Sequence, residues 1–315
     1  MSKLDILAIE GIHPFYLEAL RSEYTVHISP HKGDAQAFAQ LAPSILGIAA
    51  SGESVVPGTL MLQLPKLKVV SVFGVGYDGI DTGTANAMGV GVSHTPDVLT
   101  DDVADLALGL LLAVSRGIPQ ADQYVKAGRW PSGPMPLAKK VSGASMGIVG
   151  MGRIGKAIAR RASAFDMKIA YTARSEKPDL NLKFYPDAVS LAKNVDYLVV
   201  ITPGGEGTRH LINREVLQAL GSQGYLINVA RGSVVDQDAL VHALNSGTIA
   251  GAGLDVFANE PNVPEALWSM KNVVLTPHMA SATVQTRQAM ANLAFANLQA
   301  GVSGKALLTP VPESN

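Results

Sequence analysis

The fold is decided by the stretch Met146-Gly147-Ile148-Val149-Gly150-Met151-Gly152-Arg153-Ile154-Gly155. Its apolar first part predicts a strand, and a helical pattern follows the last glycine. The three glycines fit the spacing G-x-G-x-x-G, in which the first two let the backbone turn and approach a pyrophosphate, and the third lets helix and strand pack closely. The helix N-terminus offers N–H groups to the anion. We therefore predict a dinucleotide site that includes Gly150, Gly152, Arg153, Ile154 and Gly155.

The next expected strand, Lys168–Tyr171, bears on which dinucleotide is bound. A site for NAD places Asp or Glu about 20 residues after the glycines, but here that position is Thr172. Arg174 and Ser175 follow, and they offer a guanidinium and a hydroxyl to a 2′-phosphate. The residues favour NADP(H), with NAD(H) as the second candidate. The alternative is that Arg174 and its charged neighbours form only a solvated loop.

Outward from this stretch, short runs of Val, Ile and Ala alternate with helical patterns, which predicts the α/β class with two doubly wound parallel sheets. The helix Thr100–Val114 is predicted to connect the two domains, and Ser281–Ala300 is predicted to be helical and to pack on the first domain. The expected strands are Leu4–Ile9, Thr25–Ile28, Ile45–Ala49, Val69–Phe73 and Val90–Ser93 in the first sheet, and Ser145–Val149, Lys168–Tyr171, Tyr197–Ile201, Tyr225–Asn228, Ile249–Asp255 and Val273–Leu275 in the second.

Composition excludes several classes of protein. The 315 residues suffice for about two domains. Lys+Arg of 25 against Asp+Glu of 26 leaves a net charge of -1, so no basic field favours nucleic acid or a membrane surface. The absence of cysteine excludes disulfides, thiolate nucleophiles and cysteine-ligated metals. The first ten residues carry Asp5 and Glu10 and lack the continuous apolar run of a secretory signal, so a cytoplasmic location is expected.

Three polar residues follow strands of the second sheet, namely Arg231, Glu260 and His278. Ligands of open α/β sheets gather at the carboxyl ends of strands, so we expect this trio to converge. Arginine can hold a carboxylate, histidine can transfer a proton near neutral pH, and a carboxylate beside it raises its pKa. Taken singly, each has another explanation: Arg231 could cap a turn, Glu260 could be an ordinary exposed loop acid, and His278 could be a hydrogen-bonded structural histidine. We predict structural or surface roles for the other histidines, His13, His27, His31, His94, His210 and His242.

These segments together resemble the D-2-hydroxyacid dehydrogenase family over nearly the whole chain. Within it, 102–107 and 174–178 are most similar to the glyoxylate/hydroxypyruvate reductases, including the plant-type hydroxypyruvate and hydroxyphenylpyruvate reductases. The quoted motifs are Phe73-Gly74-Val75-Gly76-Tyr77-Asp78, Thr95-Pro96-Asp97-Val98-Leu99-Thr100, the glycine turn, Asn228-Val229-Ala230-Arg231-Gly232, Gly253-Leu254-Asp255-Val256-Phe257 and Thr276-Pro277-His278.

The resemblance implies an architecture and a division of labour. A Rossmann cofactor domain, 98–285, would be inserted into a flavodoxin-like substrate domain made of 1–97 and 286–315, with the active site in the cleft between them and a homodimer as the assembly. Arg231 would bind the carboxylate and carbonyl oxygen of a 2-keto acid, His278 would protonate that oxygen, and Glu260 would keep His278 protonated. No metal is required.

The resemblance assigns further contacts. The N–H groups of Val75 and Gly76 would bind the other end of the carboxylate, Trp130 would reach a partner's substrate pocket or simply anchor the connecting region, and Ser51 would help to set pocket size. Around the cofactor, the implied residues are Thr100, Thr172, Thr202, Pro203, Thr208, Val229, Ala230 and Asp255, beside His278 and the glycine turn. The loop Thr202–Thr208 is richer in glycine than the family pattern, which leaves its contacts open.

We therefore expect an NADPH-preferring reductase of glyoxylate and hydroxypyruvate that forms D-2-hydroxy acids. One alternative is an NADH-linked dehydrogenase of another 2-hydroxy acid, such as lactate, a hydroxyphenylpyruvate or phosphoglycerate. Another is a non-catalytic NAD(P)H-sensing protein like the corepressors that share this fold, because fold does not fix function.

Overall fold

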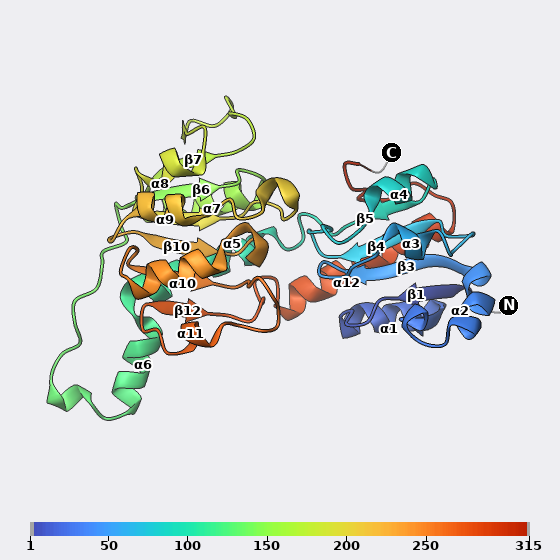
Figure 1. Cartoon of the computed structure of the whole chain (residues 1–315), viewed down its shortest axis with the longest axis horizontal. Helices are drawn as coiled ribbons and strands as arrows, with labels where there is room; N and C mark the ends of the chain where they lie inside the picture. Colours follow the sequence, from blue (N-terminus) through green and yellow to red (C-terminus); the bar gives the residue numbers. More distant parts are fainter. Residues whose placement is uncertain (1–2, 314–315) are drawn as a thin grey trace. The chain divides into compact units, whose positions relative to one another are not determined.

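A computed structural model of the chain describes residues 3–313. It divides into two compact units, which are described separately (Figure 1). Unit 1 combines the residues up to Leu99 with those from Ser281 onward, and unit 2 comprises Thr100–Ala280. The sequence predicts boundaries at 98 and 285. The units divide where they do because the helix that begins at Thr100 packs within unit 2, whereas Ser281 leads into the last helix of unit 1.

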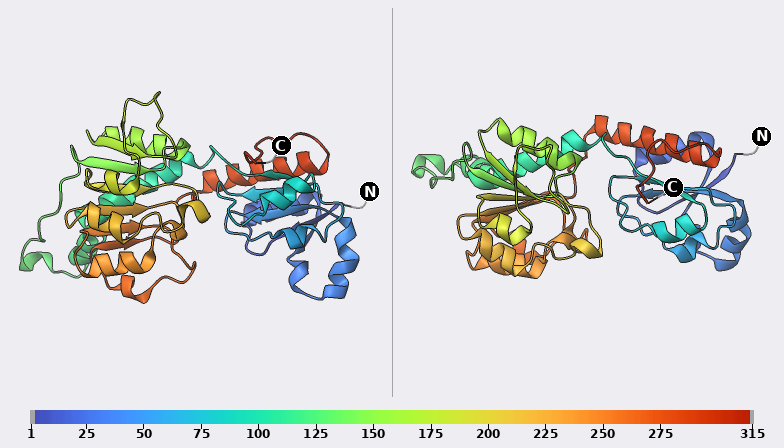
Figure 2. Two further views of the ribbon diagram at one scale, coloured as in Figure 1. Left: turned by 45° about the horizontal axis from the view of Figure 1, so that its top comes forward. Right: turned by 90° about the horizontal axis from the view of Figure 1, so that it is seen from above.

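Within the described residues, unit 1 has one five-stranded parallel sheet with the strand order β2-β1-β3-β4-β5. Helices α1 and α12 cover one face and α2, α3 and α4 the other (Figure 2). The predicted packing of the last helix on this domain is confirmed, since α12 contacts β3 and β4. The elements are β1 (Asp5–Ala8), α1 (Pro14–Glu23), β2 (Thr25–Ile28), α2 (Ala35–Leu41), β3 (Ile45–Ser51), α3 (Gly58–Met61), β4 (Val69–Phe73), α4 (Thr82–Ala87), β5 (Gly91–Ser93) and α12 (Val284–Val302).

Unit 2 has a seven-stranded parallel sheet within the described chain, in the order β12-β11-β10-β9-β6-β7-β8. Helices α5 and α7 lie on one face, and α8, α9 and α10 on the other (Figure 2). The elements are α5 (Thr100–Arg116), α6 (Ile118–Lys126), β6 (Ser145–Val149), α7 (Arg153–Ser163), β7 (Lys168–Thr172), β8 (Lys183–Phe184), α8 (Ala188–Ala192), β9 (Tyr197–Val200), α9 (Arg214–Leu220), β10 (Tyr225–Asn228), α10 (Gln237–Asn245), β11 (Gly251–Leu254), α11 (Glu265–Trp268) and β12 (Val273–Leu275).

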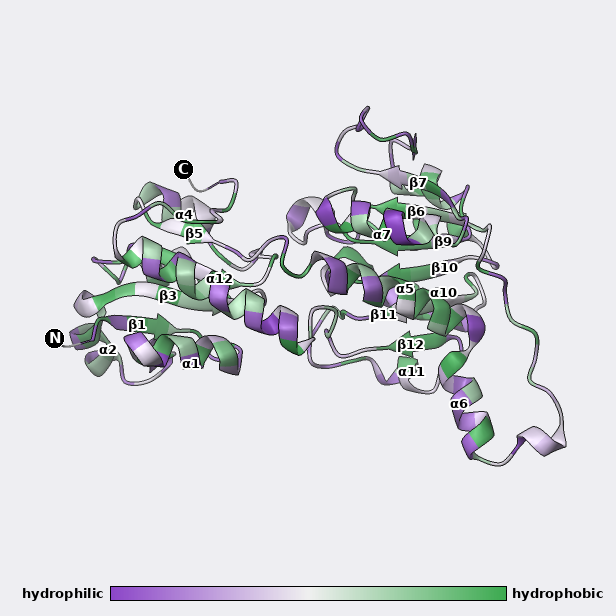
Figure 3. Cartoon of the chain, turned by 180° about the vertical axis from the view of Figure 1, so that it is seen from behind, coloured by the Kyte–Doolittle hydropathy of each residue, from purple (hydrophilic) through white to green (hydrophobic). Residues whose placement is uncertain are grey.

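The central strands of both sheets, such as β4 and β9, are buried on both faces, so they read as continuous apolar runs. Figure 3 shows the strands of both units largely in the hydrophobic colour. Ile48 in unit 1 and Val199 in unit 2 are fully buried, and each such side chain stabilises the fold by about 1.5–3 kcal/mol relative to an exposed one. In the part of the chain that the structure describes, no helix is long and apolar enough to cross a membrane.

Helix α5, predicted to connect the two domains, begins at the boundary between the two units and packs within unit 2. It contacts α7 and strands β10, β11 and β12, so it is one of the helices that cover the sheet of unit 2. Its apolar face buries Leu110 and Leu111, and Arg161 of α7 forms an ion pair with Asp101 at 2.9 Å on the outer side. A long apolar helix after a sheet can therefore belong wholly to the domain that follows it.

The predicted fold class is confirmed by the strand orders. Unit 1 has the flavodoxin-like order, and unit 2 has the Rossmann order with one further strand, β12, at its edge. In each sheet the strand order reverses once, between β1 and β3 and between β6 and β9. Ligands of such sheets bind at the carboxyl ends of the strands near this reversal, so these two edges are where a site is expected.

Candidate active site

The glycine turn lies at the strand reversal of unit 2, between β6 and α7. A Cβ atom on Gly150 would lie 2.7 Å from the carbonyl oxygen of Ile201, and one on Gly155 would lie 2.2 Å from the carbonyl oxygen of Gly150. Around Gly152, by contrast, nothing in the described chain lies within 4 Å of that position. The first helical hydrogen bond runs from Lys156 N–H to Gly152 O, 3.0 Å, so the N–H groups before it lack intrahelical acceptors. Packing requires the outer glycines, and the turn fits a pyrophosphate.

The loop after β7 presents Arg174 and Ser175, both exposed. The fully buried hydroxyl of Tyr171 accepts a hydrogen bond from Lys177 N–H at 2.7 Å and so closes the loop at its base. The loop adjoins the glycine turn, because Gly150 N–H donates to the carbonyl oxygen at the end of β7, 3.0 Å away. The structure thus places a cation and a hydroxyl at the edge where the predicted 2′-phosphate would bind.

Two members of the trio are joined by a hydrogen bond between His278 Nδ1 and Glu260 Oε2, 2.7 Å long. The other carboxylate oxygen, Oε1, accepts from Phe257 N–H at 2.9 Å. Burial raises the pKa of Glu260, but these bonds and the positive charges of His278 and Arg231 outweigh it and hold the pKa below its usual range. Glu260 is therefore a carboxylate at neutral pH, placed to orient the imidazole and to stabilise its charged form.

Asp255 supports the turn that carries His278. His278 has φ of +49°, a left-handed conformation that is uncommon for residues other than glycine but is adopted more often by Asn, Asp and His than by the rest. Its N–H donates to Asp255 O at 2.8 Å. The fully buried Asp255 carboxylate accepts from Thr276 Oγ1 (2.6 Å), Met279 N–H (2.9 Å) and Ala280 N–H (2.9 Å). Burial raises its pKa, and these bonds oppose the rise. Its predicted place beside the cofactor stays a prediction.

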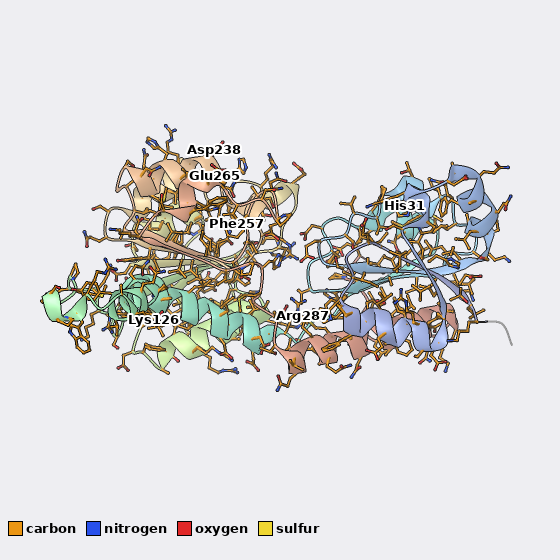
Figure 4. All side chains as sticks on the ribbon, turned by 90° about the horizontal axis from the view of Figure 1, so that it is seen from below. His31, Lys126, Asp238, Phe257, Glu265 and Arg287 are labelled. Carbon is orange, nitrogen blue, oxygen red and sulfur yellow. The ribbon has the colours of Figure 1, made fainter. Side chains whose placement is uncertain are left out.

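Arg231 follows β10 and is placed by close backbone packing. A Cβ atom on Gly232 would lie 1.9 Å from the backbone of Phe257, a buried residue labelled in Figure 4. This approach brings the segment of Arg231 against the loop of Glu260, and the Asn228 side chain donates to Arg231 O at 3.2 Å. The segment of Arg231 thus packs against the loop that carries Glu260, and the charge of Arg231 contributes to the lowered pKa of Glu260.

In unit 1, Val75 and Gly76 form the turn after β4, at the carboxyl edge of the sheet. His94, for which the sequence predicts a structural or surface role, follows β5 and contacts this turn. Its Nδ1 lies 2.9 Å from Val75 O. The two segments meet because β4 and β5 are neighbouring parallel strands that end at the same edge of the sheet. Ser51 ends β3, and its N–H donates to Ser54 Oγ at 2.8 Å.

The remaining predicted residues do not all join these groups. Trp130 is 67% exposed and lies after α6, in a segment that extends away from the rest of unit 2 (Figure 1), so within this chain it does not join the trio. The others lie near the carboxyl edge of the same sheet: Thr172 at the end of β7, Thr202, Pro203 and Thr208 in the loop after β9, Val229 and Ala230 after β10, and Thr100 as the first residue of α5. Thr208 Oγ1 donates to Pro203 O at 2.8 Å, which closes the glycine-rich loop.

Replacing Glu260 with Gln is expected to move the alkaline limb of the pH–rate profile for keto-acid reduction to lower pH by roughly one unit or more. The reason is that His278 loses its negative partner, so its pKa falls and its protonated form disappears at lower pH. Initial rates between pH 5 and 9 measure the shift. An unmoved profile would show that Glu260 does not act on the reacting proton.

The sequence is similar to a known protein family and to individual members of it. Residues 108–280 match the family model described as D-isomer specific 2-hydroxyacid dehydrogenase, NAD binding domain. Over 289 residues, 92% of this chain and 89% of the other, the sequence is 51% identical to a glyoxylate/hydroxypyruvate reductase A of Arabidopsis thaliana. It is 52% identical to a hydroxyphenylpyruvate reductase of Plectranthus scutellarioides over 270 residues, 86% of each chain.

A solved structure is also similar. The crystal structure of an NADPH-dependent glyoxylate/hydroxypyruvate reductase from Sinorhizobium meliloti, in complex with NADP and malonate, matches with a TM-score of 0.92 and 47% identity. The match covers 99% of this chain and 98% of the other. Both units therefore share their folds with this enzyme.

Proposed function

Since the chain belongs to the D-isomer specific 2-hydroxyacid dehydrogenases, we propose that it is an NADPH-preferring reductase that converts glyoxylate and hydroxypyruvate to glycolate and D-glycerate. Membership makes it an NAD(P)-dependent oxidoreductase that acts on CH–OH donors. The observation that carries the proposal is the hydrogen bond between Glu260 and His278, because it holds a histidine that can donate a proton. The charge of Arg231, which can bind an anion, acts on the same Glu260 carboxylate. The relatives' names support small keto acids as substrates.

In the proposed reaction each residue has one task. The guanidinium of Arg231 binds the substrate carboxylate and carbonyl oxygen, and the N–H groups of Val75 and Gly76 take the carboxylate from the other end. A bound nicotinamide supplies the hydride. As negative charge develops on the carbonyl oxygen, Arg231 stabilises it and His278 delivers a proton from Nε2. Glu260 holds the opposite ring nitrogen, Nδ1, and keeps the imidazolium form populated.

The preference for NADPH is proposed from the loop after β7. Thr172 leaves that position without an acid that would repel a 2′-phosphate, and Arg174 with Ser175 offers charge and a hydroxyl. The same loop would accept NAD(H), but without the contacts that Arg174 and Ser175 make to a 2′-phosphate. The solved relative that binds NADP supports this assignment.

The wild-type chain is expected to oxidise NADPH faster than NADH at equal concentrations with glyoxylate and hydroxypyruvate, followed by absorbance at 340 nm. Arg174→Asp should raise KM for NADPH by roughly 10-fold to 100-fold, since an attractive charge becomes a repulsive one. KM for NADH should change little. Arg214→Asp, which reverses an exposed charge at the start of α9, is the matched control.

The outcomes separate the candidate functions. Turnover only of hydroxyphenylpyruvate or lactate with NADH, unaffected by Arg174→Asp, would replace the proposal by the NADH-linked alternative. Cofactor binding without turnover of any keto acid would favour a sensing protein.

We also propose a homodimer, formed through the segment from α6 to residue 140. Its apolar side chains are exposed in the single chain: Ile118 is 52% exposed, Val125 54%, and Leu137 102%. Sedimentation of the purified chain measures this, and a monomer at assay concentration would contradict it. Location in the cytoplasm stays a prediction from the sequence.

A further inference from the structure

The turn after β4 has a pair of backbone donors with no acceptor in the part of the chain that the structure describes. Among residues 3–313, neither Val75 N–H nor Gly76 N–H donates a hydrogen bond. Both backbone groups of the preceding residue, by contrast, are engaged: Gly74 N–H donates to Thr95 Oγ1 at 3.1 Å, and Gly74 O accepts from Thr95 N–H at 2.8 Å. The proposed carboxylate contacts use the two unengaged donors, so their directions matter for affinity.

His94 fixes one of these directions. The carbonyl of Val75 and the N–H of Gly76 belong to the same peptide plane and point in opposite directions in the trans form. His94 Nδ1 lies 2.9 Å from Val75 O, and because a carbonyl oxygen only accepts, Nδ1 carries the hydrogen. The hydrogen bond from His94 fixes the direction of the Val75 carbonyl, and it therefore also fixes the direction of the Gly76 N–H in the same peptide plane.

The C-terminal segment holds His94 in turn. Thr309 Oγ1 donates to His94 O at 2.6 Å, and His94 N–H donates to Thr309 O at 3.2 Å. Thr309 is held by the buried amide of Asn297, whose Nδ2 lies 2.8 Å from Thr309 Oγ1. The ring of Tyr77 meets the imidazole edge-on at 5.4 Å, and its hydroxyl donates to Glu313 Oε2 at 2.9 Å.

We propose that His94 is a positioning residue for keto-acid binding: its hydrogen bond to Val75 O aims the Gly76 N–H at the substrate carboxylate, and the segment 309–313 holds the imidazole for this task. The inference rests on the proposed function, because it assumes that these N–H groups bind the substrate. It adds to the reaction a residue that touches neither the substrate nor the cofactor.

Two substitutions at one position test it. His94→Leu removes the donor and is expected to raise KM for glyoxylate roughly 10-fold, the value of one misdirected hydrogen bond to a charged group. The kcat should fall less than threefold, and KM for NADPH should not change. His94→Asn offers an amide N–H near the position of Nδ1 and should restore KM to within about threefold of the wild type. His31→Leu, at another part-buried histidine of unit 1 (labelled in Figure 4), is the control.

Binding of malonate to the NADPH complex, measured by calorimetry, gives a second readout that needs no turnover. Its Kd should rise in His94→Leu and recover in His94→Asn. If His94→Leu does not fold, Thr309→Val carries the test, since it removes the bond to His94 O and should raise KM for glyoxylate several-fold.

The failures are distinguishable. Absence of keto-acid turnover by the wild type would overturn the proposed function. A wild type that turns over glyoxylate, with unchanged KM and malonate Kd in His94→Leu, would overturn only the inference. A loss of kcat and NADPH affinity that Asn does not restore would also overturn it, because it would show a general structural role.

Discussion

Replacing His278 with Asn is expected to lower kcat for glyoxylate reduction by about 10²-fold to 10⁴-fold, the usual contribution of a positioned general acid. The substitution suits the backbone, because Asn tolerates the left-handed conformation that His278 adopts at φ +49°. Its amide can still donate to Glu260 from the position of Nδ1. Only the atoms around Nε2 are lost, so the turn over Asp255 should survive and the Kd of NADPH should stay within about twofold.

The measurement pairs steady-state rates with NADPH fluorescence titration. His242→Gln, at an exposed histidine of α10 in the same unit, should leave both unchanged. A His278→Asn enzyme with nearly full kcat would remove the proton-donor role. Loss of NADPH binding would instead point to a damaged turn.

Replacing Arg231 with Gln is expected to lower kcat/KM for glyoxylate by about 10²-fold to 10⁴-fold, because two hydrogen bonds from a charged group to an anion are lost. Both KM and kcat should worsen, since the guanidinium contacts the carboxylate in the ground state and the carbonyl oxygen as its charge develops. Arg231→Lys keeps the charge without the planar pair of donors, so its kcat/KM should lie between those of the wild type and Arg231→Gln.

Arg214→Gln removes an exposed guanidinium in the same unit and should have no such effect. The prediction is contradicted if Arg231→Gln changes kcat/KM less than tenfold. A change confined to NADPH affinity would assign Arg231 to the cofactor instead.

Sequence alone predicted the features that depend on local pattern. Strands β10 and β12 begin and end at the predicted residues, because apolar runs bounded by turn residues define buried parallel strands. The glycine turn was predictable for the same reason, since its residues are adjacent in the chain. The pairing of Glu260 with His278 followed from the rule that parallel strands end at one edge.

Features that depend on contacts distant in sequence were not predictable in this way. The two-residue strand β8, Lys183–Phe184, has no apolar run of its own and is defined by pairing with β7. The role of His94 depends on Thr309, more than 200 residues away along the chain, and no periodicity reports such a contact. The apolar face of helix α5 indicates that this helix is buried, but not that it covers strands β10, β11 and β12.

One face of the unit 1 sheet is covered by α12. The order in which the segments are synthesised therefore affects when that face can be buried. Strands β3 and β4 are synthesised before unit 2, whereas the helix that covers them is synthesised after unit 2. Unit 2 is continuous from Thr100 to Ala280, so it can fold while the first strands still expose an apolar face. While unit 2 is being synthesised, the nascent chain therefore exposes an apolar face of the unit 1 sheet, and exposed apolar surface of this kind is prone to aggregation and is bound by chaperones.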